Sequence, residues 1–127
     1  ERILLVEDEQ MLLEIETAML ENSGYTVLAA SSGKLAEELF RENLCDVDLL
    51  MTDVIMPEIN GMDLALKLQT FCPNLKVLFM SGYPQDVLGK EANIDGGANF
   101  LQKPFSMQAL KNKVREVLDV DVNIHPS

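Results

Sequence analysis

The chain has 127 residues, of which 47% are hydrophobic, so it suits one domain with a buried core. Its formal net charge is −11, with 21 acidic against 10 basic residues. The negative electrostatic field of such a chain repels nucleic acid and anionic lipid, which argues against both as direct partners. No apolar run reaches the roughly 18 residues that a membrane span needs.

Two features bear on the origin of the chain and on its compartment. The chain enters an apolar run almost at once after Glu1-Arg2, without an initiator Met and without a signal segment. We interpret it as a domain cut from a longer protein or as a processed chain. Cys45 and Cys72 are far apart and form no CxxC pattern, so free thiols in a reducing compartment are predicted rather than a disulfide.

In the first half of the chain, short apolar runs alternate with segments of helical period. Residues 3–6 and 26–30 are predicted strands. Between them, apolar residues recur at helical spacing until Ser23-Gly24 stops the helix. A second helix follows, which Ser31 or Ser32 can cap. The apolar positions of the two helices are Met11, Leu12, Ile15, Ala18 and Met19 in the first, and Leu35, Ala36, Leu39 and Phe40 in the second.

The second half continues the same alternation. Strands are predicted over residues 47–52, 76–80 and 98–101. Asn60 can cap the helix after the first of these, and Ser106 the last helix. Residues 84–95 form the weakest predicted helix, because Pro84 and Gly89 interrupt a poor apolar stripe. The expected inner faces are Leu64, Ala65 and Leu68 in the third helix, and Met107, Leu110, Val114, Val117 and Leu118 in the last.

Five strands alternating with five helices predict a single α/β domain, a doubly wound (βα)5 sandwich of flavodoxin-like architecture. Its five-stranded parallel sheet is expected in the order 2-1-3-4-5. Several strands are apolar throughout, as is typical when helices cover both faces of a sheet. The domain is predicted to span residues 1–118, and residues 119–127 to form a C-terminal tail or linker.

Four of the predicted strands run directly into polar residues. The first is followed by Glu7-Asp8, the third by Asp53, the fourth by Ser81 and the fifth by Lys103. In this strand order the ligand site lies at the carboxyl ends of the first and third strands, where the order reverses. We therefore expect these side chains to meet at one edge of the sheet.

The residue types predict a site for a divalent cation and a phosphoryl group. Three converging carboxylates repel one another, and a hard cation such as Mg²⁺ relieves that repulsion. Asp53 can then act as a nucleophile, since carboxylates form aspartyl-phosphates. Lys103 would neutralise phosphoryl oxygens, and Ser81 would donate a hydrogen bond to one of them. Each residue alone would be an ordinary loop or surface residue, and their joint occurrence on these strands favours a site.

The chain resembles the receiver domain of two-component response regulators, the chemotaxis-regulator type, over residues 2–118. Four segments carry the resemblance, and their order along the chain makes it specific. They are Leu4-Leu5-Val6-Glu7-Asp8-Glu9; Thr52-Asp53-Val54-Ile55-Met56-Pro57 with Asn60-Gly61; Met80-Ser81-Gly82-Tyr83; and Phe100-Leu101-Gln102-Lys103-Pro104-Phe105.

The resemblance implies a role for each site residue. Asp53 matches the phosphoacceptor, which takes its phosphoryl group from a phosphohistidine. The implied ligands of Mg²⁺ or Mn²⁺ are Glu7 through a water, Asp8, Asp53 and the backbone carbonyl of Ile55. Ser81 matches the switch hydroxyl, Phe100 the switch aromatic and Lys103 the site lysine, with a cis bond to Pro104. Glu7, Ser81 and Phe100 stand where aspartate, threonine and often tyrosine are the commoner residues, and none of these changes removes the chemistry.

The resemblance also implies what the domain does. It would accept a phosphoryl group in a Mg²⁺-dependent reaction and switch its conformation, catalysing only its own phosphorylation and dephosphorylation. The expected partners are a histidine kinase or phosphotransfer domain and a downstream output protein or domain, with a homodimer through the 84–118 face as a further expectation. The expected location is the cytoplasm, whether the domain is a free regulator or the C-terminal receiver of a membrane-anchored hybrid sensor histidine kinase.

Three other functions fit parts of the same pattern. A phosphohydrolase of the haloacid dehalogenase type needs a second acid two residues after the nucleophile, where this chain has Ile55. A flavodoxin-like electron carrier needs a loop rich in Ser, Thr and Gly after the first strand, and Glu7-Asp8-Glu9 would repel its flavin phosphate. A receiver-shaped interaction module that is never phosphorylated remains the third alternative.

Overall fold

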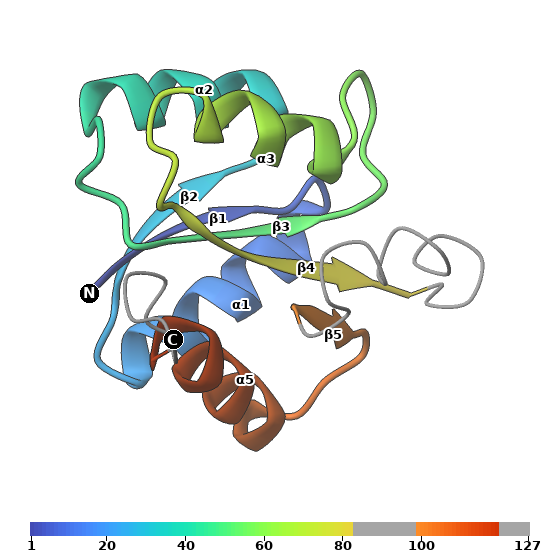
Figure 1. Ribbon diagram of the computed structural model, residues 1–127. Coiled ribbons are helices and arrows are strands. Elements are labelled where there is room, and N and C mark those ends of the chain that lie inside the picture. The colour runs from blue at the N-terminus through green and yellow to red at the C-terminus, as the bar shows by residue number, and fades with distance from the viewer. Residues whose placement is uncertain (83–98, 120–127) are drawn as a thin grey trace.

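The computed structural model describes residues 1–82 and 99–119, drawn in colour in Figure 1. The prediction of a helix over residues 84–95, and the positions of Tyr83 and of the tail beyond 119, lie outside this part of the chain. The elements are β1 (Arg2–Val6), α1 (Gln10–Asn22), β2 (Thr26–Ala30), α2 (Gly33–Glu42), β3 (Leu49–Asp53), α3 (Gly61–Gln69), β4 (Lys76–Ser81), β5 (Phe100–Gln102) and α5 (Met107–Asp119).

The strands form one parallel sheet in the order β2-β1-β3-β4-β5, which confirms the predicted fold. The boundaries differ by a few residues from those expected, chiefly at β3, which starts at Leu49 and ends at Asp53. Val6 pairs with Thr52, Asp53 with Met80 and Ser81 with Gln102, so the four strands end at nearly the same level. This register makes the carboxyl edge of the sheet a common platform for the site.

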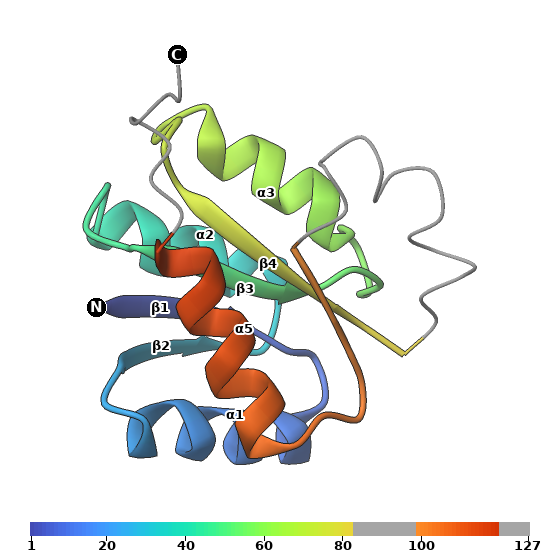
Figure 2. The same ribbon diagram turned by 60° about the horizontal axis from the view of Figure 1, so that its bottom comes forward.

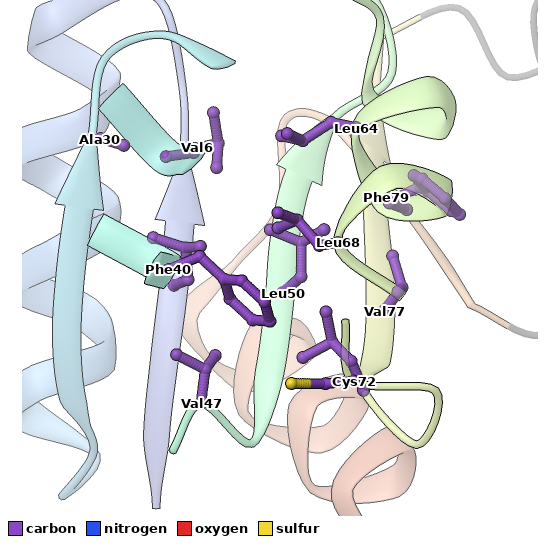
Figure 3. Close-up of a cluster of buried hydrophobic side chains, with 14 of the residues drawn as sticks. Val6, Ala30, Phe40, Val47, Leu50, Leu64, Leu68, Cys72, Val77 and Phe79 are labelled. Carbon is purple, nitrogen blue, oxygen red and sulfur yellow. The ribbon is translucent and has the colours of Figure 1, made fainter. Parts of the chain in front are cut away.

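Helices cover both faces of the sheet, α2 and α3 on one and α1 and α5 on the other (Figures 1 and 2). Two buried clusters result, one between the sheet and α2/α3 and one between the sheet and α1/α5. Figure 3 shows the first of them, with Phe40 and Leu50 near its centre. Among the described residues, no helix is long and apolar enough to cross a membrane.

The predicted helix caps are confirmed. The Ser32 Oγ accepts a hydrogen bond from the Leu35 N–H at 3.1 Å, and the Asn60 Oδ1 accepts one from the Asp63 N–H at 2.8 Å. The Ser106 Oγ accepts from the Ala109 N–H at 3.0 Å. Each cap satisfies an amide that the first helical turn leaves without a partner. The caps therefore set the starting points of three helices from the sequence alone.

Two predicted helix faces differ from the structure. In α1 the buried side chains are Leu13, Glu16 and Leu20, whereas Met11 is 73% and Ile15 46% exposed. The apolar residues of this helix form two overlapping stripes, and packing against the sheet selects the one that contains Glu16. In α5 the expected inner residue Met107 is 38% exposed, and it is the first residue of the helix.

The prediction of two free thiols was wrong, because Cys45 and Cys72 form a disulfide with their Cα atoms 5.6 Å apart. Cys45 lies in the loop before β3 and Cys72 in the loop before β4. Since β3 and β4 are parallel neighbours, the loops that lead into them meet at the amino edge of the sheet. Spacing along the sequence does not show this approach, so the absence of a CxxC pattern did not exclude a disulfide.

Candidate functional site

The predicted site residues come together at the carboxyl edge of the sheet. Glu7 and Asp8 follow β1, Asp53 ends β3, Ser81 ends β4 and Lys103 follows β5. The Lys103 N–H donates to the Ser81 carbonyl at 2.9 Å, which extends the pairing of the two strands into the site. The Lys103-Pro104 peptide bond is cis, as the resemblance implied. The structure therefore brings the strand ends that the sequence predicted for the site to one edge of the sheet.

Three carboxylates form the acidic part of the site. One ligand oxygen from each of Glu7, Asp8 and Asp53 lies within 4.8 Å of the others. Glu7 is fully buried and Asp53 is 5% exposed, whereas Asp8 faces solvent. The Glu9 N–H donates to the Glu7 Oε2 at 3.2 Å and orients that side chain. Oxygen ligands in this arrangement suit a hard divalent cation, which would enter from the side of Asp8.

Lys103 joins the two buried carboxylates. Its Nζ lies 2.6 Å from the Glu7 Oε1 and 2.7 Å from the Asp53 Oδ1, and its side chain is 19% exposed. These distances are those of charge-assisted hydrogen bonds. Burial disfavours the ammonium, but the ion pairs with Asp53 and Glu7 outweigh it and raise the pKa of Lys103 above its usual range. Lys103 therefore stays charged and fixes one oxygen of Asp53.

The two buried carboxyls differ in their affinity for a proton. Burial raises the pKa of Asp53 to about 8, and the adjoining Glu7 carboxyl adds to that shift against the opposing effect of Lys103. Burial also disfavours ionisation of Glu7, but its interactions with Asp53, Lys103 and the Glu9 N–H together lower its pKa. In the metal-free site Glu7 is therefore the ionised partner, and Asp53 holds a proton near neutral pH.

The segment after Asp53 is held against the sheet by backbone contacts. The Val54 N–H donates to the Met80 carbonyl at 3.0 Å, and the Gly61 N–H donates to the Val54 carbonyl at 2.7 Å. A Cβ on Gly61 would clash with the carbonyl oxygen of Asp53 and lie 2.9 Å from its carbonyl carbon. Only glycine lets the start of α3 approach Asp53 this closely. Gly61 belongs to one of the segments that resemble the receiver family, and this contact gives a steric reason for glycine at that position.

The remaining predicted site residues occupy three positions around the carboxylates. Ser81 is buried, at 6% exposure, at the end of β4. The Phe100 ring stacks on Phe79 with its centroid 5.4 Å away. The side chain of Ile55 is 57% exposed, so most of its surface faces solvent. The position of Tyr83 falls outside the described residues.

Sequence reasoning missed Glu16, a fourth carboxyl beside the site. Glu16 lies on the inner face of α1, is 3% exposed, and its Oε1 accepts no hydrogen bond from the described residues. Burial raises the pKa of Glu16 to about 9, and the charge of Glu7 adds to this shift. The spacing of Leu13, Glu16 and Leu20 on one helical face was the available signal, because it places the glutamate on an apolar stripe.

We expect Glu16 to make the metal-free protein less stable as the pH rises. In the unfolded chain a glutamate ionises near pH 4.3, whereas folded Glu16 holds its proton to about pH 9, so stability falls across that interval. Glu16→Gln cannot ionise and should raise the free energy of unfolding at pH 8 by on the order of 2 kcal/mol, with little effect at pH 5. Urea denaturation at both pH values measures this difference.

Exposed Glu14 on the same helix provides the matched control for this prediction. Glu14→Gln should leave the pH dependence of the wild type unchanged. Parallel pH profiles for wild type and Glu16→Gln would contradict the assignment of a buried, protonated Glu16.

The residues fit the cation that the acidic cluster implies. Asp53 Oδ2 is buried and accepts no hydrogen bond from the part of the chain that the structure describes, while Oδ1 is held by Lys103. An unpaired buried oxygen beside two further carboxylates is costly without a cation or a proton. The donor set of Glu7, Asp8 and Asp53 therefore matches a divalent metal site of the Mg²⁺ type.

Fold and site together define a doubly wound domain with an acidic cluster and a lysine arranged for phosphoryl chemistry on an aspartate. A family model described as the response regulator receiver domain matches residues 3–115. The chain belongs to this family, whose members act in two-component signalling and are phosphorylated on an aspartate.

Relatives of two kinds match this chain. The sensor kinase CckA of Brucella abortus is 38% identical over 117 residues, which are 92% of this chain but 12% of that kinase. The response regulator receiver protein CpdR of the same organism is 33% identical over 117 residues, which are 92% of this chain and 96% of that protein. Receivers similar to this chain therefore occur both within a long kinase and as nearly the whole of a small protein.

Solved structures agree in fold. The receiver domain of the hybrid histidine kinase CckA is 35% identical with a TM-score of 0.78, and the match covers 94% of this chain and 100% of that one. The response regulator TrrA of Thermotoga maritima, in complex with Mg²⁺ and BeF, is 26% identical with a TM-score of 0.79, covering 92% and 98%.

Proposed function

We propose that this domain accepts a phosphoryl group from a phosphohistidine onto Asp53. The observation that carries this assignment is the unequal state of the two Asp53 oxygens. Lys103 holds Oδ1 at 2.7 Å, whereas Oδ2 accepts no hydrogen bond from the described residues. One oxygen is therefore fixed and the other can form a new bond, which is the arrangement that an in-line nucleophile needs.

In the proposed transfer, Asp53 Oδ2 attacks the phosphorus atom of the donor. The bond between phosphorus and the imidazole nitrogen breaks, and its electron pair stays on that nitrogen, which then takes up a proton. Lys103 would neutralise the charge on the transferred group, and Ser81 would donate a hydrogen bond to one of its oxygens. The domain would act as catalyst only for its own phosphorylation and dephosphorylation.

The cation would be held by Glu7 through a water, by Asp8 and Asp53, and by the backbone carbonyl of Ile55, and either Mg²⁺ or Mn²⁺ fits this donor set. The bound cation would keep Asp53 ionised and offset the negative charge of the phosphoryl group. This matters here because the pKa of Asp53 without metal is about 8.

The signal would leave the site through Ser81 and Phe100. An acyl phosphate adds about two negative charges, judged from other protein phosphates. Ser81 would move onto that group, and Phe100, now stacked on Phe79, would turn inward to fill the space. The output partner or a second copy of the domain would read the altered face of residues 84–118.

The phosphodonor would be a histidine kinase or a phosphotransfer domain. The two kinds of relative support two settings, the C-terminal receiver of a hybrid sensor kinase and a free single-domain regulator. Identity is higher to the kinase, at 38% against 33%, and favours the hybrid setting. Since transfer needs donor and acceptor in one compartment, the domain would work in the cytoplasm beside its kinase.

Asp53→Asn should abolish phosphorylation, because an amide oxygen is a poor nucleophile and cannot form the acyl phosphate. Intact-protein mass after incubation with acetyl phosphate, with and without Mg²⁺, measures the gain of one phosphoryl group. We expect a Mg²⁺-dependent gain in the wild type and none in the variant. Asp48→Asn, a change at an exposed aspartate before β3, should behave as the wild type.

A gain that persists in Asp53→Asn would place the acceptor elsewhere. Absence of any gain in the wild type, from acetyl phosphate and also from a phosphorylated histidine kinase, would favour the receiver-shaped module that is never phosphorylated.

A further inference from the structure

The Cys45–Cys72 disulfide encloses the segment that carries the acceptor. The two cysteines are 27 residues apart in sequence, and the ring between them contains β3, Asp53, the loop with Ile55 and the whole of α3. Figure 3 shows Cys72 at the end of the buried cluster where the strands begin, opposite the carboxyl edge. The disulfide therefore joins the two ends of the acceptor segment at the amino edge of the sheet, away from the site at the carboxyl edge.

The two cysteine residues differ in their exposure to solvent. Cys45 is exposed, whereas Cys72 is 7% exposed and packs in the core with Val47 and Leu75. A cavity of about 380 Å³ at the surface is lined by both cysteines, together with Pro73 and Lys76. A small thiol or disulfide can therefore reach the link, and Cys45 is the more exposed of its two residues.

The backbone at Cys45 points to a role for its sulfur. Cys45 has a φ of 59°, in the left-handed region, inside a turn closed by a 2.8 Å hydrogen bond from the Asp46 N–H to the Asn43 carbonyl. Glycine and asparagine adopt this conformation at the lowest cost, and for other residues it raises the conformational free energy by on the order of 1 kcal/mol or more. A cysteine here is unfavourable for the turn itself, so its presence indicates a use for the thiol.

Both cysteines are held in place by contacts that do not depend on the link. The turn bond at Asn43 fixes Cys45, and the Cys72 N–H donates to the Leu68 carbonyl at 3.1 Å while the Leu75 N–H donates to the Cys72 carbonyl at 3.0 Å. These bonds fix the backbone of each turn, and the pairing of β3 with β4 brings the two turns together, with their Cα atoms 5.6 Å apart, a separation that suits a disulfide. A reduced pair would therefore remain positioned to close again.

We propose that Cys45 is a site of reversible thiol–disulfide exchange with low-molecular-weight disulfides such as oxidised glutathione, with Cys72 as the resolving thiol. On closing, the Cys45 thiolate attacks one glutathione sulfur and forms a mixed disulfide, which releases one glutathione thiolate. The Cys72 thiolate then attacks the Cys45 sulfur and releases the second. The two cysteines lose two protons and two electrons, and one glutathione disulfide becomes two glutathione thiols. Opening is the reverse, and begins at exposed Cys45.

Closing the ring should stabilise the acceptor segment. A disulfide that spans about 28 residues restricts the unfolded chain, and we expect the oxidised protein to melt about 10 °C above the reduced one. The redox state of the surrounding thiol pool would thus set the stability of the domain, independently of its phosphorylation.

The test equilibrates the whole chain, natively folded, in glutathione buffers from reducing to oxidising and then blocks free thiols with N-ethylmaleimide under denaturing conditions. Intact mass should show two adducts in the reduced form and none in the oxidised form, with the same ratio reached from either direction. Thermal melts of the two end states should show the expected difference in Tm.

Cys45→Asn is the control variant, because asparagine suits the left-handed turn and cannot form the link. Its Tm should lie above that of the reduced wild type, below that of the oxidised wild type, and not respond to glutathione. The proposal is overturned if glutathione opens or closes the link only after denaturation. It is equally overturned by a stable Cys45–glutathione adduct, by disulfide-linked dimers as the main product, or by equal Tm values for the two forms.

Discussion

Lys103→Met should lower the free energy of unfolding of the metal-free protein by about 3 kcal/mol at pH 8, because it leaves ionised Glu7 and partly ionised Asp53 buried without their cation. Lys103 contacts Glu7 at 2.6 Å and Asp53 at 2.7 Å, and Glu7 is fully buried. Methionine keeps most of the side-chain volume, so the loss measures charge rather than a cavity. Urea denaturation of wild type and variant gives the difference directly.

The loss should depend on pH in a definite direction. Without Lys103 the pKa values of Glu7 and Asp53 both rise, so each carboxyl can take up a proton in the folded state as the pH falls. The destabilisation should therefore be smaller at pH 5 than at pH 8. The charge of Lys103 itself does not vary over this range, since the raised pKa of this ammonium lies above it.

Lys67→Met is the matched control for burial. Lys67 forms an ion pair with Glu37 at 2.6 Å, but its side chain is 51% exposed, and such surface pairs contribute less than about 1 kcal/mol. Equal losses for the two variants would mean that burial of the Lys103 pairs does not set their strength.

Gly61→Ala should destabilise the protein by about 2–3 kcal/mol, because overpacking against a rigid backbone forces the chain to move. The added methyl group would clash with the Asp53 carbonyl oxygen and lie 3.1 Å from the Thr52 Cγ2. Alanine normally stabilises a helix relative to glycine by up to about 1 kcal/mol, so a loss here would oppose the helix propensity. The variant should also take up less phosphoryl group from acetyl phosphate, since the shift displaces Asp53.

Gly82→Ala serves as the comparison for this prediction. A Cβ on Gly82 meets nothing within 4 Å among the described residues, although Gly82 directly follows Ser81 in the site. Its unfolding free energy should stay close to that of the wild type. A stable Gly61→Ala protein with normal phosphorylation would show that the start of α3 can withdraw from Asp53 without cost.

Much of the site could be predicted because a parallel sheet converts position along the chain into position in space. Glu7, Asp53, Ser81 and Lys103 each follow an apolar run, and parallel strands bring their carboxyl ends to one edge. The helix caps at Ser32, Asn60 and Ser106 could also be predicted from the sequence, since a cap depends on residues within one helical turn. These features rest on local geometry and on one topological rule.

The burial of Glu16 was decided only by the tertiary structure. Two apolar stripes overlap on α1, and the choice between them depends on how the helix rests on the sheet, which its own residues do not specify. The same choice leaves Met11 and Ile15 in solvent. A carboxyl therefore lies beside the acidic site, where periodicity alone placed an apolar face.

The sequence by itself predicted the sheet order, the helix starts and the candidate residues at the ends of the strands, because these follow from local pattern and from the rules for parallel sheets. Only the tertiary structure decided that Lys103 bridges Glu7 and Asp53 and that Cys45 meets Cys72. Both depend on segments that are distant in sequence approaching within a few ångström. Such approaches are set by the packing of the whole domain.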